Sequence, residues 1–255
     1  MTASSVPRAA RSVRREWDLL RSSTDEPKTF KPSMTAGLPE PARRWLTHAI
    51  APGTPLWQSV ELSMRGQIRL GAWRPFTARQ VLAPPRGFIW AATAQLFGLP
   101  VVGFDRLSSG SGQMRWRLGG LIPVVSADGP DITRSAAGRL AGEMALVPTT
   151  FPSATWTPGS DDDRVVVTWR IGGQDESAEL HTGPDGRLLG VLMQRWGNPN
   201  GAPFGPYPFG VAIESEQTFT DVTIGSVLRA GWWWGTDRQP EGEFFRAQIT
   251  GATFR

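Results

Sequence analysis

The sequence of 255 residues contains no cysteine, only two histidines, and only two lysines, Lys28 and Lys31. Thiolate chemistry, iron–sulfur clusters and Cys/His zinc sites are therefore excluded. Because both lysines lie near the N-terminus, a phosphate-binding Walker lysine or a buried Schiff-base lysine in the folded body is excluded as well. The motifs G-x-S-x-G and H-E-x-x-H are absent, and no G-x-G-x-x-G follows a predicted strand. We therefore expect neither a metal nor a cofactor.

The chain also lacks a dense basic stripe, although its isoelectric point is about 10.5. Residues 1–32 carry seven basic and four acidic side chains, which leaves twenty basic and nineteen acidic ones in residues 33–255. The body of the protein is thus nearly neutral, and a nucleic-acid partner is not expected. We expect residues 1–36 to form a flexible basic segment and residues 37–255 to form a single domain.

Long hydrophobic runs are missing too. No continuous apolar run follows the basic N-terminus, so no secretory signal is predicted. The longest uncharged stretch, residues 87–104, is interrupted by Thr93, Gly98 and Pro100, and two strands joined at residues 97–100 explain it better than a membrane span. We therefore expect a cytoplasmic protein that does not span a membrane; its oligomeric state cannot be derived from the sequence.

Two helices and many strands are predicted. Helical spacing of apolar residues indicates helices over residues 38–50 and 131–147. Elsewhere apolar and polar residues alternate, as is typical of antiparallel strands with unlike faces, over residues 62–70, 113–118, 165–171, 224–234 and 244–249. The predicted fold class is α+β and mainly β: a strongly curved antiparallel sheet, either a half-barrel or a barrel, with an N-terminal helix and a mid-chain helix over its open face.

Aromatic residues are the most unusual part of the composition, since twelve tryptophans and twelve phenylalanines accompany a single tyrosine. Rigid aromatic walls are typical of sites for apolar ligands. The segment 197–210 is rich in proline, glycine and aromatic residues, and is interpreted as a lid or, equally, as a rigid surface connection. The candidate ligand-binding residues are Trp116, Trp169, Trp196, Phe204, Tyr207, Phe209, Trp232 and Trp234. The alternative is that these side chains only fill a large core.

Two other functions remain open. A cofactor-independent cyclase or isomerase would need a shaped pocket and one or two groups for proton transfer. Candidate catalytic residues for it are Asp105, Glu143, Glu214, Asp237 and Arg238. For Glu214, an ion ladder on the outer face of a strand is the simpler interpretation. A purely structural or partner-binding β-domain is the third possibility.

Several segments resemble an uncharacterised family common in actinobacteria, a domain of unknown function. They are LPEPARRWLTHAIAPGTPL, MRGQIRLGAWRPFTARQ, GQMRWRLGGLIPVVSADGPDITRSAAGRLAGEMALVPT and GEFFRAQITGATFR, and the resemblance extends over residues 38–255. It implies no particular activity. The order of elements is also similar to that of lipoprotein-carrier half-barrels, in which a curved sheet and a helical lid enclose a lipid-sized cavity. This similarity concerns the fold alone. The aromatic residues are what predict a cavity that binds a hydrophobic small molecule or lipid-like metabolite.

Overall fold

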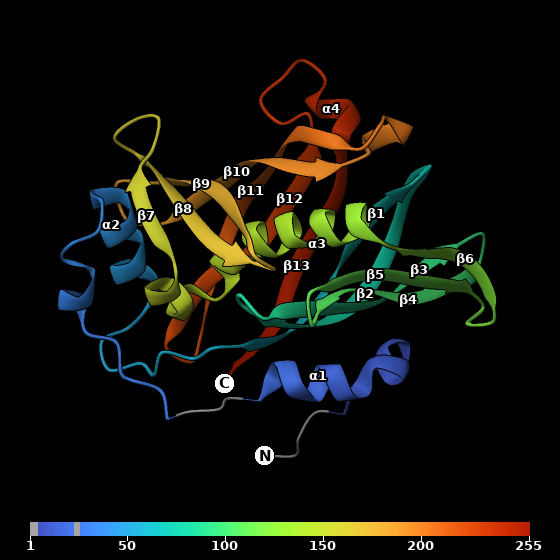
Figure 1. The fold of residues 1–255 in the computed structure, drawn as a ribbon, viewed down its shortest axis with the longest axis horizontal. Coiled ribbons are helices and arrows are strands. Elements are labelled where there is room, and N and C mark those ends of the chain that lie inside the picture. The colour runs from blue at the N-terminus through green and yellow to red at the C-terminus, as the bar shows by residue number, and fades with distance from the viewer. Residues whose placement is uncertain (1–4, 23–25) are drawn as a thin grey trace.

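The structure, a computed structural model, describes residues 5–22 and 26–255. Within these residues, one antiparallel sheet of thirteen strands has the order β6-β5-β4-β3-β2-β1-β13-β12-β11-β10-β9-β8-β7 (Figure 1). The strands are β1 (Val60–Leu70), β2 (Ala72–Ala83), β3 (Gly87–Leu96), β4 (Leu99–Ser108), β5 (Ser111–Leu118), β6 (Ile122–Asp128), β7 (Thr155–Pro158), β8 (Arg164–Ile171), β9 (Gln174–Thr182), β10 (Leu188–Gly197), β11 (Gly205–Phe219), β12 (Val222–Trp232) and β13 (Glu243–Phe254). Every neighbouring pair is antiparallel. The first and last strands of the chain, β1 and β13, pair in the middle of the sheet without a connecting turn.

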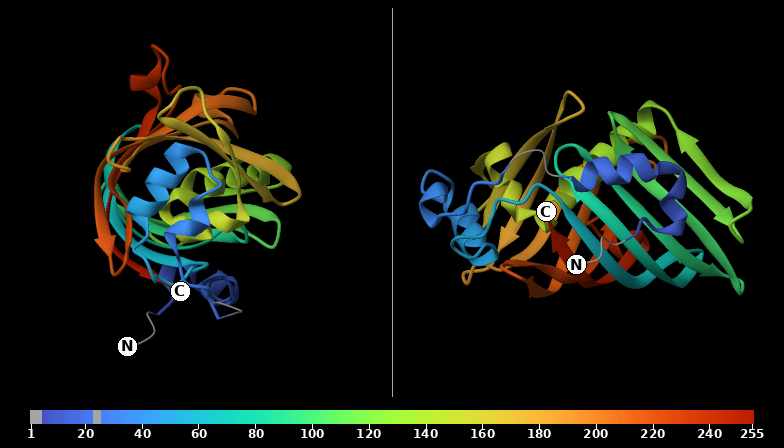
Figure 2. Two further views of the ribbon diagram at one scale, coloured as in Figure 1. Left: turned by 90° about the vertical axis from the view of Figure 1, so that its left-hand side faces the viewer. Right: turned by 90° about the horizontal axis from the view of Figure 1, so that it is seen from below.

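The sheet curves into an open trough, which confirms the predicted fold class (Figure 2). Alternation decides which side chains enter the trough: in β8, Val165, Val167 and Trp169 are buried while the residues between them are partly exposed. The uncharged stretch of residues 87–104 forms β3 and β4, joined at Phe97 and Gly98 as predicted. None of the helices in the described part of the chain is long and apolar enough to cross a membrane.

Helix α2 (Glu40–Ala49) closes one end of the trough. Proline at positions 39 and 41 suits the helix start, where a backbone N–H has no intrahelical partner. The apolar stripe of the helix is buried; Trp45 packs against Trp156 of β7, and Ile50 forms a bridge to Val222 at the start of β12. The helix predicted over residues 38–50 is therefore confirmed.

Helix α3 (Pro130–Glu143) lies across the open mouth of the trough (Figure 2). It contacts β3 to β6 along one side and β8 to β10 along the other. The mid-chain helix was predicted over residues 131–147; the regular α-helix ends at Glu143, and a short 3-10 turn, η3 (Met144–Leu146), follows it.

The N-terminal segment differs from the flexible tail that its charge predicts. A 3-10 helix, η1 (Arg8–Val13), and helix α1 (Arg14–Arg21) pack on the convex face of β2 to β4. Trp17 and Leu20 are buried there against Ile89 and Phe104. The charge count does not reveal this packing, because the segment has few apolar residues; most of them, including Trp17 and Leu20, fall on one buried face, while Leu19 is exposed.

The remaining short elements lie between these strands and helices. They are η2 (Pro32–Thr35), η4 (Pro148–Ser153), η5 (Pro199–Gly201) and α4 (Gln239–Gly242).

Candidate functional site

Aromatic rings form a continuous row across the concave face of the sheet, which we call the aromatic row. Neighbouring ring centroids along it are 5.2 to 6.4 Å apart. In order, the row is Trp116 of β5, Trp90 of β3, Phe76 of β2, Phe245 and Phe244 of β13, Phe209 of β11 and Trp232 of β12. Strands far apart in the sequence thus contribute to one apolar surface, because the sheet order brings β13 between β1 and β12.

Helix α3 is fixed to both edges of the trough mainly by polar contacts. On the β5 side, the Gly112 amide donates to Thr133 Oγ1 at 3.0 Å. On the β10 side, Trp196 Nε1 donates to Asp131 Oδ1 at 3.0 Å, and the Arg134 guanidinium lies 3.8 Å from the Trp196 ring centroid. The buried side of the helix is small, because its fully buried residues are two alanines, one glycine and Leu140. Little apolar area therefore attaches this helix to the sheet.

A charged network lies between α3 and the concave face, centred on Arg139. This guanidinium donates to Asp105 of β4 at 3.0 Å and to Glu143 of α3 at 2.7 Å, and it stacks over Trp90 of the aromatic row at 5.1 Å. Gln80 of β2 donates to the other Glu143 oxygen. The Asp105 carboxylate also accepts a bond of 2.8 Å from Trp116 Nε1. The network thus ties the helix to one half of the aromatic row.

Arg195 of β10 lies over the other half of the row. Its guanidinium is 4.7 Å from the Phe209 ring centroid and 5.0 Å from that of Trp232. Its only hydrogen bond to a described residue is a long one of 3.5 Å, from Nη2 to the Ser135 carbonyl, and the buried Nε has no partner among the described residues. Within the described chain no carboxylate forms an ion pair with it. Arg195 is therefore a cation with spare donors above an apolar surface.

Burial shifts the pKa values of this network. Burial raises the pKa of Asp105, although Arg139 and the Trp116 hydrogen bond lower it in part. Burial and, to a smaller extent, the charge of Arg139 lower the pKa of Arg195 to about 10, although the nearby carboxylates of Glu143, Asp105 and Glu176 oppose the shift. Burial would lower the pKa of Arg139, but Glu143 and Asp105 outweigh it, so the pKa is raised. Both guanidinium groups stay charged at neutral pH.

The predicted wall residues divide into three groups. Trp116, Phe209 and Trp232 belong to the aromatic row. Trp169 is buried in the core of β8, with its indole N–H lacking a partner among the described residues, and Trp196 contacts α3 at the edge of the trough. These two tryptophans lie beside the row without joining it.

The remaining wall candidates lie elsewhere. The interpretation of residues 197–210 as one irregular lid or surface connection is corrected by the structure. Residues 205–219 form β11, so Tyr207 and Phe209 belong to the sheet, and the irregular connection is limited to residues 198–204. Phe204 is in this connection, while the Tyr207 hydroxyl donates to the Pro203 carbonyl at 2.8 Å. Prolines are tolerated in β11 because β10 and β12 end near them.

The alternation that puts Trp232 and Trp234 on one face also fails. The backbone turns at Trp233, whose φ is +59°. Trp234 then covers Gly210, where an added Cβ would lie 2.2 Å from its indole. The strand ends at Trp232, so the alternation of side chains between the two faces of the sheet stops there.

Of the predicted catalytic residues, only Asp105 and Glu143 meet, through Arg139. Glu214 pairs with Arg229 on the outer face, as in the ion-ladder interpretation. Asp237 is in the loop before α4, and Arg238 pairs with Glu241 at 3.3 Å and stacks on the Trp233 ring at 4.1 Å. These last three residues lie outside the network.

Sequence reasoning missed several members of the site. They are Phe76, Trp90, Arg139, Arg195, Phe244, Phe245 and Phe88 of β3, whose ring centroid lies 4.7 Å from the Arg139 guanidinium. The alternation of β13 signals that Phe245 faces inward. No local pattern distinguishes Arg139 and Arg195 from surface arginines, because the order of strands in the sheet, and no neighbour in the sequence, places each of them beside its aromatic partners.

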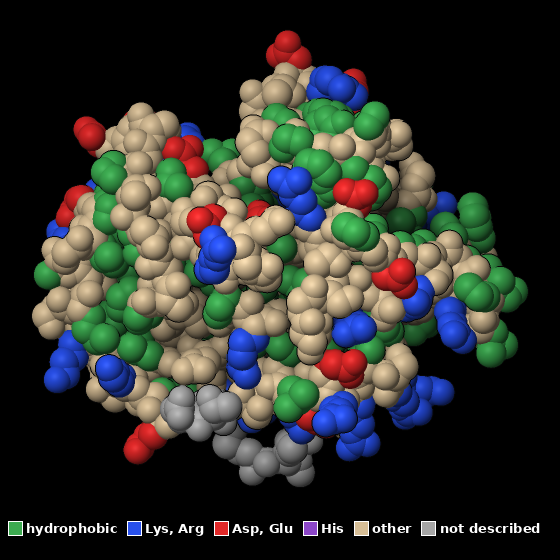
Figure 3. All heavy atoms as spheres, in the orientation of Figure 1, with side chains coloured by type: hydrophobic (Ala, Val, Ile, Leu, Met, Phe, Trp, Pro, Cys, Tyr) green, Lys and Arg blue, Asp and Glu red, His purple; other side chains and the backbone are tan. Residues whose placement is uncertain are grey.

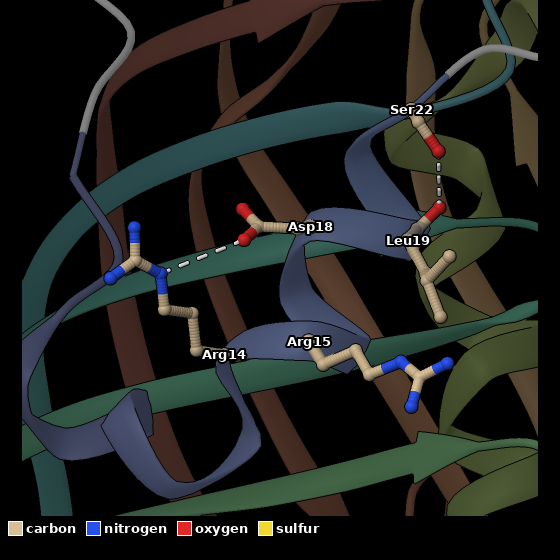
Figure 4. Close-up of a pocket in the computed structure, with 5 residues that line it drawn as sticks. All are labelled: Arg14, Arg15, Asp18, Leu19 and Ser22. Carbon is tan, nitrogen blue, oxygen red and sulfur yellow. Dashed lines mark hydrogen bonds and ion pairs between the residues drawn. The ribbon is translucent and has the colours of Figure 1, made fainter.

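Open depressions lie on the outside of the molecule. One, of about 630 Å³, runs along α1 and is lined by charged residues, with Arg14 and Asp18 paired at 3.7 Å (Figure 4). Another, of about 940 Å³, lies over the outer face of β1, β2, β12 and β13 beside Gly66. The first depression does not reach the aromatic row, and the second includes one member of the row, Phe76, among its lining residues. The described residues contain no cluster of three or more acidic or histidine side chains arranged to hold a metal.

Residues 28–244 match the model of a family of unknown function, DUF6544. No curated protein is significantly similar to the chain. Among solved structures, a LolA superfamily protein from Nitrosomonas europaea is 10% identical, with a TM-score of 0.43, and the match covers 77% of this chain and 85% of that one. A domain described as an outer membrane lipoprotein-sorting protein, from Vibrio parahaemolyticus, is also 10% identical, with a TM-score of 0.38 and coverage of 78% and 86%. The expected similarity to lipoprotein carriers is thus found, at low identity.

Proposed function

We propose that this chain, which belongs to the DUF6544 family, binds a hydrophobic small molecule or lipid-like metabolite between α3 and the concave face of the sheet. The observation that carries the proposal is the aromatic row, a continuous apolar surface that reaches from β5 to β12. Trp116, Trp232, Phe244 and Phe245 remain partly exposed, so the row is not sealed into the core. An elongated apolar molecule lying along these rings would bury its length against them.

Helix α3 is the element that must move for such a ligand to enter. Polar contacts attach it to the sheet, and these can be exchanged for contacts with water at a modest net cost. Its apolar attachment is limited to small residues and Leu140. Opening at α3 is therefore easier than at α2, whose Trp45, Leu46 and Ile50 are deeply buried.

Arg195 suggests that the ligand has an anionic or strongly polar end. The guanidinium has unused donors and no carboxylate partner among the described residues, yet it lies over the rings of Phe209 and Trp232. A carboxylate or phosphate group at this position would gain a charge-assisted hydrogen bond. A fatty acid meets both requirements, and we use one as the probe below.

The enzyme alternative is less well supported. Its inward acids, Asp105 and Glu143, are both engaged by Arg139, whereas a general acid or base needs a free proton-exchanging group facing the substrate. The cytoplasmic location, the absence of a nucleic-acid partner and the absence of a cofactor remain predictions. Cell fractionation would test the first of them.

A reversible lock on α3 tests the proposal. An added Cβ at Gly142 would lie 3.3 Å from the Met193 sulfur, so the two positions face each other between α3 and β10. The double variant Gly142→Cys, Met193→Cys would form a disulfide on oxidation, and no native cysteine competes with it. We expect the reduced protein to bind a long-chain fatty acid carrying an environment-sensitive fluorophore, and the oxidised protein to bind it at least tenfold more weakly.

The reduced and oxidised forms are matched controls for each other, because their sequence is identical. Equal binding by both would contradict a site under α3. Native mass spectrometry of the wild-type protein as isolated is the second measurement. If it shows no bound apolar molecule and the probe does not bind to either form, the binding proposal as a whole is wrong.

A further inference from the structure

One end of the sheet exposes large apolar side chains at its turns. The hairpins β1–β2, β3–β4 and β5–β6 all turn at this end, which we call the hairpin end. Phe97 is 83% exposed, Leu121 is 79% exposed and Ile122 is 63% exposed. Also exposed there are Leu70, Leu99, Val124 and Val125. Exposed apolar surface of this extent marks an interaction site, because turns at a surface in contact only with water are usually polar.

The exposed residues form one surface. The Gly119 amide, in the β5–β6 turn, donates to the Pro100 carbonyl of β4 at 2.7 Å, which fixes the second and third hairpins together. The Arg74 guanidinium of β2 lies 5.2 Å from the Phe97 ring centroid and so connects the first hairpin to the second. Hydrophobic side chains gather at the end where β5 and β6 turn, with basic side chains beside them (Figure 3).

The charge of this half of the sheet is predominantly positive. Between Leu62 and Ala127 the sequence contains a single acidic residue, Asp105. The same stretch contains eight arginines, Arg65, Arg69, Arg74, Arg79, Arg86, Arg106, Arg115 and Arg117. Of these, Arg69, Arg74 and Arg117 lie within three residues of the exposed turns, and none forms an ion pair with an acid of the described chain. The apolar tips are thus surrounded by uncompensated positive charge.

We propose that the hairpin end docks on the surface of an anionic lipid bilayer. Phe97, Leu121 and Ile122 would enter the boundary between headgroups and acyl chains, and the arginines would contact lipid phosphates. A second copy of the chain is a poorer occupant, because a two-fold interface would place the same arginines against each other. The docking goes beyond the ligand site under α3 and needs no bound ligand.

Flotation with lipid vesicles tests this docking on the full chain. We expect binding to vesicles of phosphatidylcholine with 30% phosphatidylglycerol, and binding about a hundredfold weaker to phosphatidylcholine alone, since each of three arginines contributes roughly fivefold near an anionic surface. The double variant Phe97→Asn, Leu121→Asn should lose most of the binding. Asparagine suits position 97, where φ is +50°. Leu19→Asn is the matched control, because Leu19 is 58% exposed on α1, away from the hairpin end.

The absence of native cysteine allows a direct measurement of insertion. Leu121→Cys and Leu19→Cys, each labelled with an environment-sensitive fluorophore, should differ: only the label at position 121 should shift to the blue on adding the anionic vesicles. Failure of the wild-type chain to float with these vesicles overturns the proposal, as does equal binding by the double variant. A third outcome also overturns it: self-association by analytical ultracentrifugation that the double variant abolishes, without vesicle binding, would make the hairpin end an interface between copies.

Discussion

Arg139 of α3 lies 3.0 Å from Asp105 of β4, and both side chains are only 17% exposed. The same guanidinium holds Glu143 one helical turn further along α3. One arginine therefore neutralises two largely buried carboxylates and joins the helix to the sheet. Such a group is costly to remove, because its partners would remain buried without a counter-charge.

We expect Arg139→Met to lower the free energy of unfolding by about 3–5 kcal/mol, the range for breaking a buried ion pair from one side. The control is Arg170→Met. Arg170 pairs with Asp175 at the same distance of 3.0 Å, but both side chains are about two-thirds exposed, so the loss should be about 0–1 kcal/mol. Urea unfolding followed by circular dichroism measures both. Equal losses for the two variants would show that the Arg139 network contributes no more than a surface pair.

The pH dependence of stability should separate two aspartates with opposite pKa shifts. Burial raises the pKa of Asp105 above its ordinary value of 3.8, so between 3.8 and the raised value the folded chain binds more protons than the unfolded chain. Stability due to this group therefore falls as the pH rises through that interval. We expect the unfolding free energy of the wild type, minus that of Asp105→Asn, to decrease with rising pH.

Asp185 is the control for this measurement. The hydrogen bond from the Arg187 amide lowers the pKa of Asp185 below 3.8, so its contribution is present above 3.8 and is lost as the pH falls through the lowered value. The difference between wild type and Asp185→Asn should thus increase with rising pH. Urea titrations from pH 3 to 7 give both slopes, and a common sign would contradict the assignment for Asp105.

The local parts of this fold could be predicted from the sequence, and the long-range parts could not. Alternation located five of the thirteen strands, β1, β5, β8, β12 and β13, and helical spacing located α2 and α3, because both patterns depend on neighbours in the chain. The pairing of β1 with β13 has no local signal, yet it places Phe76 beside Phe245 and so builds the aromatic row. Trp116 and Trp232 were therefore found as individual aromatic residues, while their connection through the row was not.

Glycines beneath two tryptophans should be intolerant of any side chain. An added Cβ would lie 2.4 Å from the Trp232 indole at Gly197 and 2.2 Å from that of Trp234 at Gly210. Because a ring must then shift in a packed environment, we expect Gly197→Ala and Gly210→Ala each to cost about 1–3 kcal/mol. Gly37→Ala is the control, since nothing lies within 4 Å of a Cβ there. Thermal melts of the three variants would compare them, and tolerance at all three sites would mean that the tryptophans are loosely held.

The N-terminal segment should stabilise the sheet although its composition is that of a tail. Trp17 is fully buried, and its indole donates to Glu61 of β1 at 3.3 Å, beneath the stacked Arg79 guanidinium. Removing a buried tryptophan costs about 3–5 kcal/mol, so Trp17→Ala should lower the unfolding free energy by that amount. Leu19→Ala, on the exposed side of the same helix, should change it by less than about 0.5 kcal/mol.

Truncation tests the same contact without any substitution. A chain that begins at residue 26 leaves Val81, Ile89 and Phe104 without cover on the convex face. An apolar patch there should bind a hydrophobic dye and promote association, since these buried side chains would then be exposed to water. If the truncated chain keeps its melting temperature and binds no more dye than the full chain, the segment does not hold the position described for it. The N-terminal segment would then be a basic tail, as its composition alone suggests.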